Sequence, residues 1–200
     1  MYDLAANIAA ALSYGGGMST YMPEKDFIEV QRLTYGVTET ILESSLQLTK
    51  RLGLGVVNEQ AIEDISAFRR AGHFVYDPEM IMPAYWTSGT GLPVRLIVYY
   101  DRTPVAYAVG AMTVNSIDIN YWEMSTKAPQ EIHVHWIPIL TASLEDLSVF
   151  MEKLSKSEIS VEKFAFTSPT PCDSISFESA GFTKVDNYCK GIPAVVTYRK

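Results

Sequence analysis

Between residues 131 and 182 the apolar residues follow two different spacings: every second residue at first, and then every third or fourth residue. From residue 131 to 138, apolar side chains alternate with histidines, as Ile132, Val134 and Trp136 do with His133 and His135. Alternation of β-branched and aromatic residues with polar ones is typical of a strand whose two faces meet different surroundings. The pattern therefore predicts a strand over residues 131–138.

The period changes after this segment. Apolar residues three and four apart predict an amphipathic helix over residues 144–156: Leu144, Leu147, Phe150, Met151 and Leu154. Ser143 and Asp146 have the spacing of a capping box, which places the start of that helix. A second strand is predicted at 161–166, followed by a short helix that ends at Gly181. A strand, a helix and a second strand in this order predict a parallel pair with a crossover helix.

The first 53 residues are predicted to be mainly helical. Residues 4–12 are mostly apolar and helix-prone, and the glycines at 15–17 separate them from a longer helical pattern at 27–52. Gly36 would divide that pattern into two helices. Residues 4–12 either pack on their own domain or form an arm that inserts into a neighbouring subunit. A strand at 41–48 is an alternative, since Thr, Ser and Ile are frequent there.

Between these two regions, residues 54–124 are predicted to contain a helix, an irregular connection and several strands. Asn58 caps a predicted helix that runs to Gly72. Residues 73–93 combine prolines and glycines with many apolar side chains, which predicts an irregular connection that covers the core or forms a contact surface. Further strands are predicted at 54–57, in a hairpin at 94–100 and 105–114, and at 117–124.

Composition excludes several classes of protein. The chain has 200 residues, of which 48% are apolar and 20% charged, as is usual for one globular domain. A net charge of -7 argues against a nucleic-acid-binding surface, because phosphate binding needs an excess of Lys and Arg. Two cysteines are too few for a disulfide framework. The N-terminus lacks the basic region of a signal peptide, and no apolar run approaches the roughly 20 residues that span a bilayer. We therefore expect neither a nucleic-acid nor a membrane partner.

The C-terminal part of the chain resembles the GNAT family of N-acetyltransferases. The most specific part of the resemblance is residues 176–185 (SFESAGFTKV), which are similar to the segment that closes the family's last helix. The resemblance implies an α+β (α/β) fold, with a GNAT-like mixed, twisted sheet flanked by helices. Residues 54–200 would be this GNAT-like core, and residues 1–53 an N-terminal helical extension.

The same resemblance locates a cofactor site. The family binds the pyrophosphate of acyl-CoA on backbone N–H groups at the start of the helix after the central strand, in a glycine-rich loop. Neither glycine nor cation stands between Pro138 and Asp146, and Glu145 and Asp146 would repel a pyrophosphate there. The resemblance sets four residues at this position as the cofactor-binding candidates: Thr141, Ala142, Ser143 and Leu144.

Catalytic groups are scarce in the same alignment. The family's frequent general acid is a tyrosine four residues before the glycine of the Gly-Phe pair, and here that residue is Phe177, which has no proton to give. Glu131 is the candidate general base, with a solvated residue at a strand end as the alternative. His133 and His135 share a face of the predicted strand, but no third ligand lies near, so no metal is expected.

Two functions follow from these expectations. The first is a GNAT-like domain that has lost acyl-CoA chemistry and acts as a structural or protein-interaction module, by analogy with phage virion or accessory proteins with eroded GNAT cores. It needs no cofactor, contacts a protein partner or itself through residues 1–53 and 73–93, and lies in the cytoplasm or within a virion. The alternative is an acyl-CoA-dependent N-acetyltransferase with an atypical pyrophosphate loop and acetyl-CoA as its cofactor.

Overall fold

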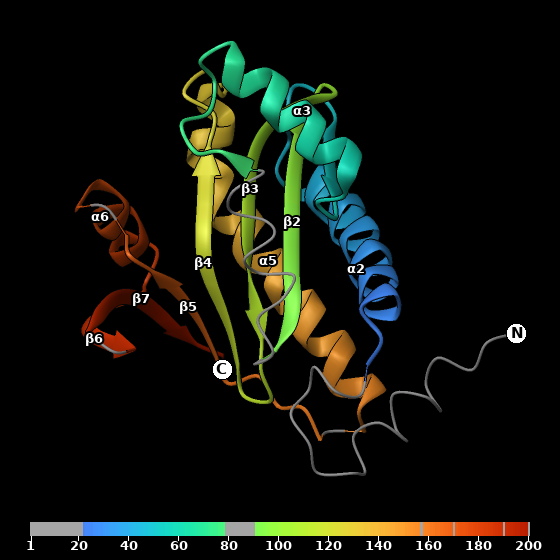
Figure 1. Cartoon of the computed structure of the whole chain (residues 1–200), viewed down its shortest axis with the longest axis vertical. Helices are drawn as coiled ribbons and strands as arrows, with labels where there is room; N and C mark the ends of the chain where they lie inside the picture. Colours follow the sequence, from blue (N-terminus) through green and yellow to red (C-terminus); the bar gives the residue numbers. More distant parts are fainter. Residues whose placement is uncertain (1–21, 79–90, 157, 170, 190, 200) are drawn as a thin grey trace, which may run out of the picture.

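One mixed β-sheet forms the centre of the molecule (Figure 1). The computed structural model describes residues 22–78, 91–156, 158–169, 171–189 and 191–199. In these residues seven strands pair in the order β1-β2-β3-β4-β5-β7-β6. Their bounds are Leu52–Gly55 for β1, Leu92–Tyr100 for β2, Thr103–Met112 for β3, Ser116–Met124 for β4, Lys163–Thr167 for β5, Thr183–Cys189 for β6 and Ile192–Tyr198 for β7.

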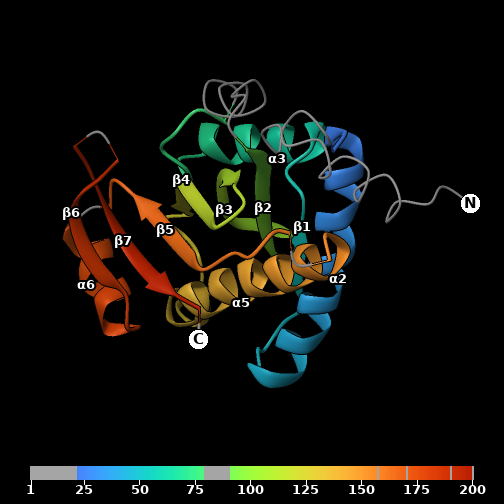
Figure 2. The same cartoon turned by 90° about the horizontal axis from the view of Figure 1, so that it is seen from below.

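Helices cover both faces of this sheet. Their bounds are Glu24–Ser45 for α2, Glu59–Arg70 for α3, Gln130–Leu154 for α5 and Pro171–Ser179 for α6. Figure 2 shows α2, α5 and α6 on one face and α3 on the other. The larger apolar core lies under α2, α5 and α6, and a smaller one lies under α3. In the described part of the chain, no helix is both long and apolar enough to cross a bilayer.

The predicted strand at 131–138 is wrong, because these residues form the first turns of α5. Ile132 and Trp136 are buried on the core side of the helix, whereas Val134 is 62% exposed. Apolar residues two apart therefore do not share a face. The four-residue spacing from Ile132 to Trp136 continues the stripe of the predicted helix at 144–156 toward the N-terminus. Pro138 lies inside α5, where its missing N–H leaves the carbonyl of the exposed Val134 to solvent.

The predicted pairing of residues 131–138 with 161–166 is wrong, but a parallel pair with a crossover helix does exist, and its first strand is β4. β4 and β5 pair in parallel from Ser116 opposite Lys163 to Ile119 opposite Phe166. The crossover between them is α5, whose second half is the helix predicted at 144–156. The prediction had the correct order of elements and misplaced the strand by one segment, since β4 occupies the stretch at 117–124.

The hairpin of β2 and β3 is confirmed, with antiparallel pairing from Leu92 opposite Met112 to Tyr100 opposite Thr103. Next to β4 the register of β3 shifts at Gly110. A Cβ atom at Gly110 would stand 2.0 Å from the carbonyl oxygen of Asp118, so only glycine fits this close approach of two strands.

The N-terminal half of the described chain agrees only in part with the prediction. The helix capped by Asn58 is confirmed, since the Asn58 side chain accepts a hydrogen bond from the Ala61 N–H. α2 is continuous through Gly36, so the predicted division there is wrong, as is the alternative strand at 41–48. The predicted helix at 4–12 lies outside the described residues, as do residues 79–90 of the predicted contact segment.

α2 supplies hydrogen bonds to the edge of the sheet. β1 ends opposite Ile97, so the first half of β2 has no neighbouring strand on that side. The buried side chain of Gln31 takes its place: its amide donates to the Pro93 carbonyl at 2.9 Å and its oxygen accepts from the Arg95 N–H at 2.7 Å. The outer edge of β1 is satisfied in the same way. The Glu39 carboxylate accepts a hydrogen bond from the Leu54 N–H at 2.8 Å, and the Glu43 carboxylate accepts one from the Leu52 N–H at 3.1 Å.

Replacing Gln31 with methionine tests this edge. Met has nearly the same shape but leaves the Pro93 carbonyl and the Arg95 N–H without partners, at about 1 to 3 kcal/mol for each buried group. We expect Gln31→Met to lower the free energy of unfolding by about 2 to 6 kcal/mol, measured by urea denaturation. The matched control is Gln60→Met on the exposed face of α3, which should stay within about 0.5 kcal/mol of the native protein. Equal effects of the two substitutions would contradict the edge role.

Candidate functional site

β4 and β5 separate after a short parallel pairing, and the gap between them is the candidate site. The pairing ends where Ile119 lies opposite Phe166. One residue further, the Thr167 hydroxyl donates a hydrogen bond of 3.1 Å to the side-chain oxygen of Asn120. β5 ends at this threonine, whereas β4 continues to Met124. In open sheets with parallel strands, ligands usually enter at such a split.

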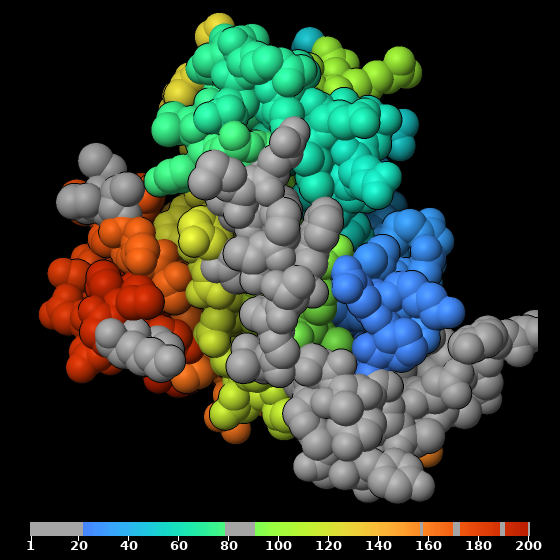
Figure 3. All heavy atoms as spheres, viewed as in Figure 1, coloured from blue at the N-terminus to red at the C-terminus, as the bar shows by residue number. Residues whose placement is uncertain are grey.

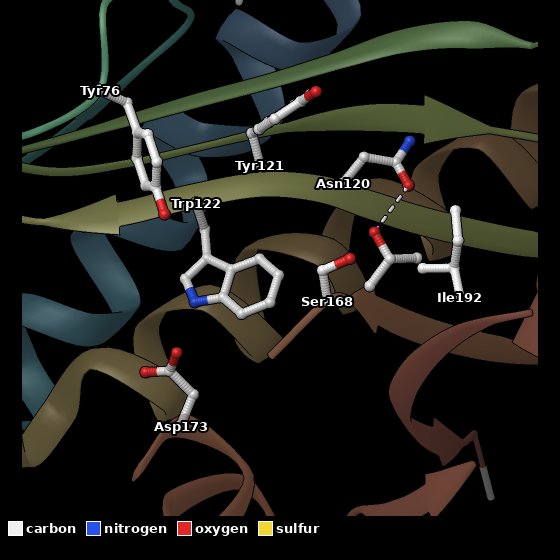
Figure 4. A pocket seen from close by; sticks show the side chains of 8 residues that line it. Tyr76, Asn120, Tyr121, Trp122, Ser168, Asp173 and Ile192 are labelled. Atoms are coloured by element: carbon white, nitrogen blue, oxygen red, sulfur yellow. Dashed lines mark hydrogen bonds between the residues drawn. The ribbon is translucent and has the colours of Figure 1, made fainter. Parts of the chain in front are cut away.

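A cavity of about 440 Å³ occupies the split (Figure 4). Tyr76 and Trp122 contribute aromatic rings, and Ser168 and Asp173 contribute polar groups on the side of β5 and α6. Cavities of roughly 300 to 1,000 Å³ with apolar walls and a few polar groups are typical of small-molecule sites. This cavity therefore suits a ligand that has a flat or aliphatic part and a polar group.

The segment after α3 brings Tyr76 to the cavity. Glu123 of β4 is buried and accepts hydrogen bonds from the backbone N–H groups of Val75 and of Tyr76, the latter at 3.3 Å. The Tyr107 hydroxyl donates to the same carboxylate at 2.8 Å. Burial, and then the charge of Glu123, raise the pKa of Tyr107 well above its ordinary value. Glu123 therefore fixes the start of the 73–93 segment over β4.

On the opposite side of the cavity the backbone takes an uncommon conformation. Ser168 has a φ of 53°, in the left-handed region that non-glycine residues rarely adopt. Its N–H donates to the Pro193 carbonyl at 2.8 Å, which holds the turn after β5 against the start of β7. Ser168 is one of the residues that line the cavity (Figure 4). Strained backbone of this kind often marks a functional position.

Four aromatic rings form the floor between β4, β5 and α6. The rings of Phe166 and Phe177 lie 4.7 Å apart between centroids, and Trp122 meets both edge-on at 5.9 and 6.0 Å. Phe182 packs against Phe177 at 5.0 Å. Phe177, which stands at the family's general-acid position, is 2% exposed. It therefore serves this apolar floor and has no group that could donate a proton.

Glu131, the predicted general base, lies elsewhere, in the first turn of α5. Its carboxylate accepts hydrogen bonds from the Thr49 N–H at 3.0 Å, from the Thr49 hydroxyl at 2.7 Å and from the Tyr100 hydroxyl. These bonds, led by that of Tyr100, lower the pKa of Glu131 below its ordinary value of 4.5. A lowered pKa makes a carboxylate a weaker base, since general bases work best near the operating pH. Glu131 joins the chain after α2 to the start of α5.

The four predicted cofactor-binding residues do not form a loop. Thr141, Ala142, Ser143 and Leu144 lie in the middle of α5, and the last two are buried. The predicted capping box is wrong, because α5 starts at Gln130 and the Ser143 hydroxyl donates to the Ile139 carbonyl within the helix at 2.8 Å. Asp146 accepts a hydrogen bond of 2.7 Å from the Thr38 hydroxyl of α2. The connection between β4 and α5 is instead residues 125–129.

His133 and His135 are two residues apart on a helix, so they do not share a face as the predicted strand required. Within the described residues, no group of three or more His, Cys, Asp or Glu side chains could hold a metal ion.

Comparison with known proteins identifies the fold. No family model matches this sequence, and no curated protein matches it. A probable acetyltransferase from Staphylococcus epidermidis superposes with a TM-score of 0.50 and 10% identity, over 74% of this chain and 99% of that chain. The chain has the GNAT fold.

Other solved structures are similar at a lower score. The Campylobacter jejuni N-acetyltransferase PseH, in complex with acetyl coenzyme A, has a TM-score of 0.48 and 14% identity, over 74% of this chain and 99% of that chain. An acetyltransferase from Thermus thermophilus has a TM-score of 0.48 and 10% identity, over 74% and 97%. The predicted mixed sheet flanked by helices is confirmed as a GNAT fold with a helix before it.

Sequence reasoning missed the residues that line the split of the GNAT fold. The sequence predicts Asn120 and Trp122 in a strand at 117–124, but the alternation at 131–138 indicates those residues, and not 117–124, as the partner of β5. Their signal was the extended run at 117–124, which directly precedes the helix. Tyr76 belongs to the predicted apolar connection at 73–93, and nothing in the sequence pairs that segment with Glu123.

The hydrogen bonds of Glu131 predict a pH-dependent contribution to stability. Since the folded pKa is lowered, this contribution is complete above about pH 4.5 and is lost as the pH falls through the folded pKa. Glu131→Gln should therefore lower the melting temperature at pH 7, and the difference from the native protein should shrink below pH 4.5. Glu145→Gln on the exposed face of α5 is the control and should change little. A Glu131→Gln deficit that is constant from pH 7 to pH 3 would contradict this role.

Proposed function

We propose that this chain is a GNAT-fold domain that has lost acyl-CoA chemistry and works as a protein-interaction module. The observation that supports this most directly is the connection between β4 and α5, residues 125–129. In the GNAT family the start of the helix after the central strand carries the pyrophosphate on free backbone N–H groups. In this chain that position contains no glycine and a single cation, Lys127.

The backbone N–H groups of this connection are used inside the protein. Ser125 donates to the Val105 carbonyl at 2.8 Å, and Thr126 donates to the His73 carbonyl at 2.9 Å. The Lys127 N–H donates to the Ser125 hydroxyl at 3.2 Å, and the Ala128 N–H to the Ser125 carbonyl at 3.0 Å. The last position is a proline, which has no N–H. A pyrophosphate would have to replace these bonds, each worth about 0.5 to 1.5 kcal/mol.

The charge at the start of α5 opposes an anion as well. Glu131 lies two residues after the connection, and its lowered pKa keeps it ionised at neutral pH. An anion at this helix start would interact with the negative carboxylate as well as with the positive end of the helix dipole. Phe177, at the position of the family's acid, is buried and has no proton to donate, which also supports the loss of acyl-CoA chemistry.

Exposed apolar residues support the interaction role. Val75 and Tyr76, at the start of the predicted contact segment 73–93, are 69 and 50% exposed while their N–H groups are held by Glu123. Apolar side chains held rigidly at the surface are typical of protein contacts. We therefore propose that a protein partner binds at Val75 and Tyr76. The location of the chain in the cytoplasm or a virion stays a prediction.

The cavity in the split favours the alternative, an acyl-CoA-dependent N-acetyltransferase with an atypical loop. Its volume and aromatic walls are those of a ligand site, and it lies where a ligand of this fold class would enter. Acetyl-CoA would then be bound with the connection at 125–129 rather than with residues 141–144.

Acetyl-CoA binding separates the two functions. A ligand present at about 100 times its dissociation constant adds about 2.7 kcal/mol, which raises the melting temperature of a chain of this size by about 5 to 10 °C. We expect no such shift with millimolar acetyl-CoA, and no heat of binding by calorimetry. Saturable binding that is lost in Lys127→Ala, together with acetyl transfer to an amine, would contradict the proposal and establish the alternative.

A further inference from the structure

One row of apolar side chains on α2 is exposed in the described part of the chain. Leu33, Val37 and Ile41 are 49, 59 and 52% exposed, and their spacing of four residues places them on one face. The row on one side of it is occupied, because Thr38 binds α5, and Gln31 on the inner face binds the sheet edge. Figure 3 shows α2, in blue, at one side of the molecule.

Gly36 lies beside this row and has no role in the described packing. A Cβ atom built on it meets no atom within 4 Å, and glycine inside a helix is less stable than alanine. Thr40 and Ser44 continue the Gly36 row at the same spacing, so small exposed residues form a groove next to the apolar ridge. A ridge beside a groove is the surface that a second helix packs against. Gly36 suits the close approach of such a helix.

We propose that residues 4–12 of the same chain dock on this row as a helix. Their Leu4, Ile8 and Leu12 repeat the four-residue spacing of the α2 row, and the residues between them are mainly alanines, which fit against the groove. Residues 4–12 carry no charge. A second copy of α2 fits less well, because α2 has five acidic and two basic residues, so that two such helices would repel each other.

The linker is long enough for docking within one chain. Residues 13–23, which include three consecutive glycines, span at most about 36 Å when extended. Val37 lies about 20 Å along the helix axis from the start of α2. A short flexible linker gives an effective concentration in the millimolar range, so the segment of the same chain occupies the row before one from another molecule does at micromolar protein.

Disulfide trapping in the full-length chain tests this. The variant carries Ile8→Cys and Val37→Cys, with Cys172 and Cys189 replaced by serine, and is incubated at micromolar concentration in a glutathione redox buffer. The control carries Val134→Cys in place of Val37→Cys, because Val134 is the same residue type, is 62% exposed and lies on another helix. We expect an intramolecular disulfide to form at least ten times faster with Val37 than with Val134, at a rate independent of protein concentration.

Two outcomes would overturn the proposal. Equal rates for the two pairs would show that residues 4–12 do not prefer the α2 row. Disulfide-linked dimers whose yield rises with protein concentration would show that the segment docks on another molecule.

A further variant, Gly36→Leu in the Ile8/Val37 cysteine background, fills the groove without disturbing the described packing. It should slow the disulfide at least fivefold with no loss of melting temperature. An unchanged rate would overturn the helix-on-helix geometry.

Discussion

The open edge of the sheet is the constraint on which the rest of this structure depends. Unpaired N–H and C=O groups on an edge strand are costly when buried and promote pairing with other chains when exposed. Side chains of α2 supply hydrogen-bond partners for these edge groups. Gln31 takes the place of a neighbouring strand on β2, and Glu39 and Glu43 accept hydrogen bonds from the outer N–H groups of β1. Because these bonds fix α2 on the sheet, its Thr38 can hold α5 through Asp146. Residues 24–45 thus share one core with the strands and α5.

The crossover helix α5 determines where the sheet splits. It follows β4 after the connection at 125–129 and returns the chain to β5, which pairs with only the first half of β4. The connection at 125–129 is held on one side by Val105 of β3 and on the other by His73 after α3. These bonds hold the connection before α5, and under the proposed function they withdraw its N–H groups from a phosphate.

Three residues at positions considered for catalysis or cofactor binding contact other parts of the protein. Glu131 joins Thr49 and Tyr100, Asp146 joins Thr38, and Phe177 belongs to the aromatic floor under the split. In each case the side chain contacts another element of the protein. The cavity above the floor retains the shape of a ligand site, with Tyr76 and Ser168 on its walls. This combination underlies the proposal of a GNAT fold that acts through contacts.

Local patterns in the sequence determined the helix capped by Asn58, the hairpin of β2 and β3, the helix after residue 143 and the order of strand, helix and strand. Each depends on residues close in the chain, whose periodicity and caps are readable directly. The tertiary structure decided the state of residues 131–138, because alternation over a few residues fits a strand and a helix turn alike, and only burial of Ile132 and Trp136 against the sheet selects the helix. It also decided the partners of Gln31, Glu123 and Glu131, since each pairs with groups far away in the sequence that only the folded chain brings within hydrogen-bonding distance.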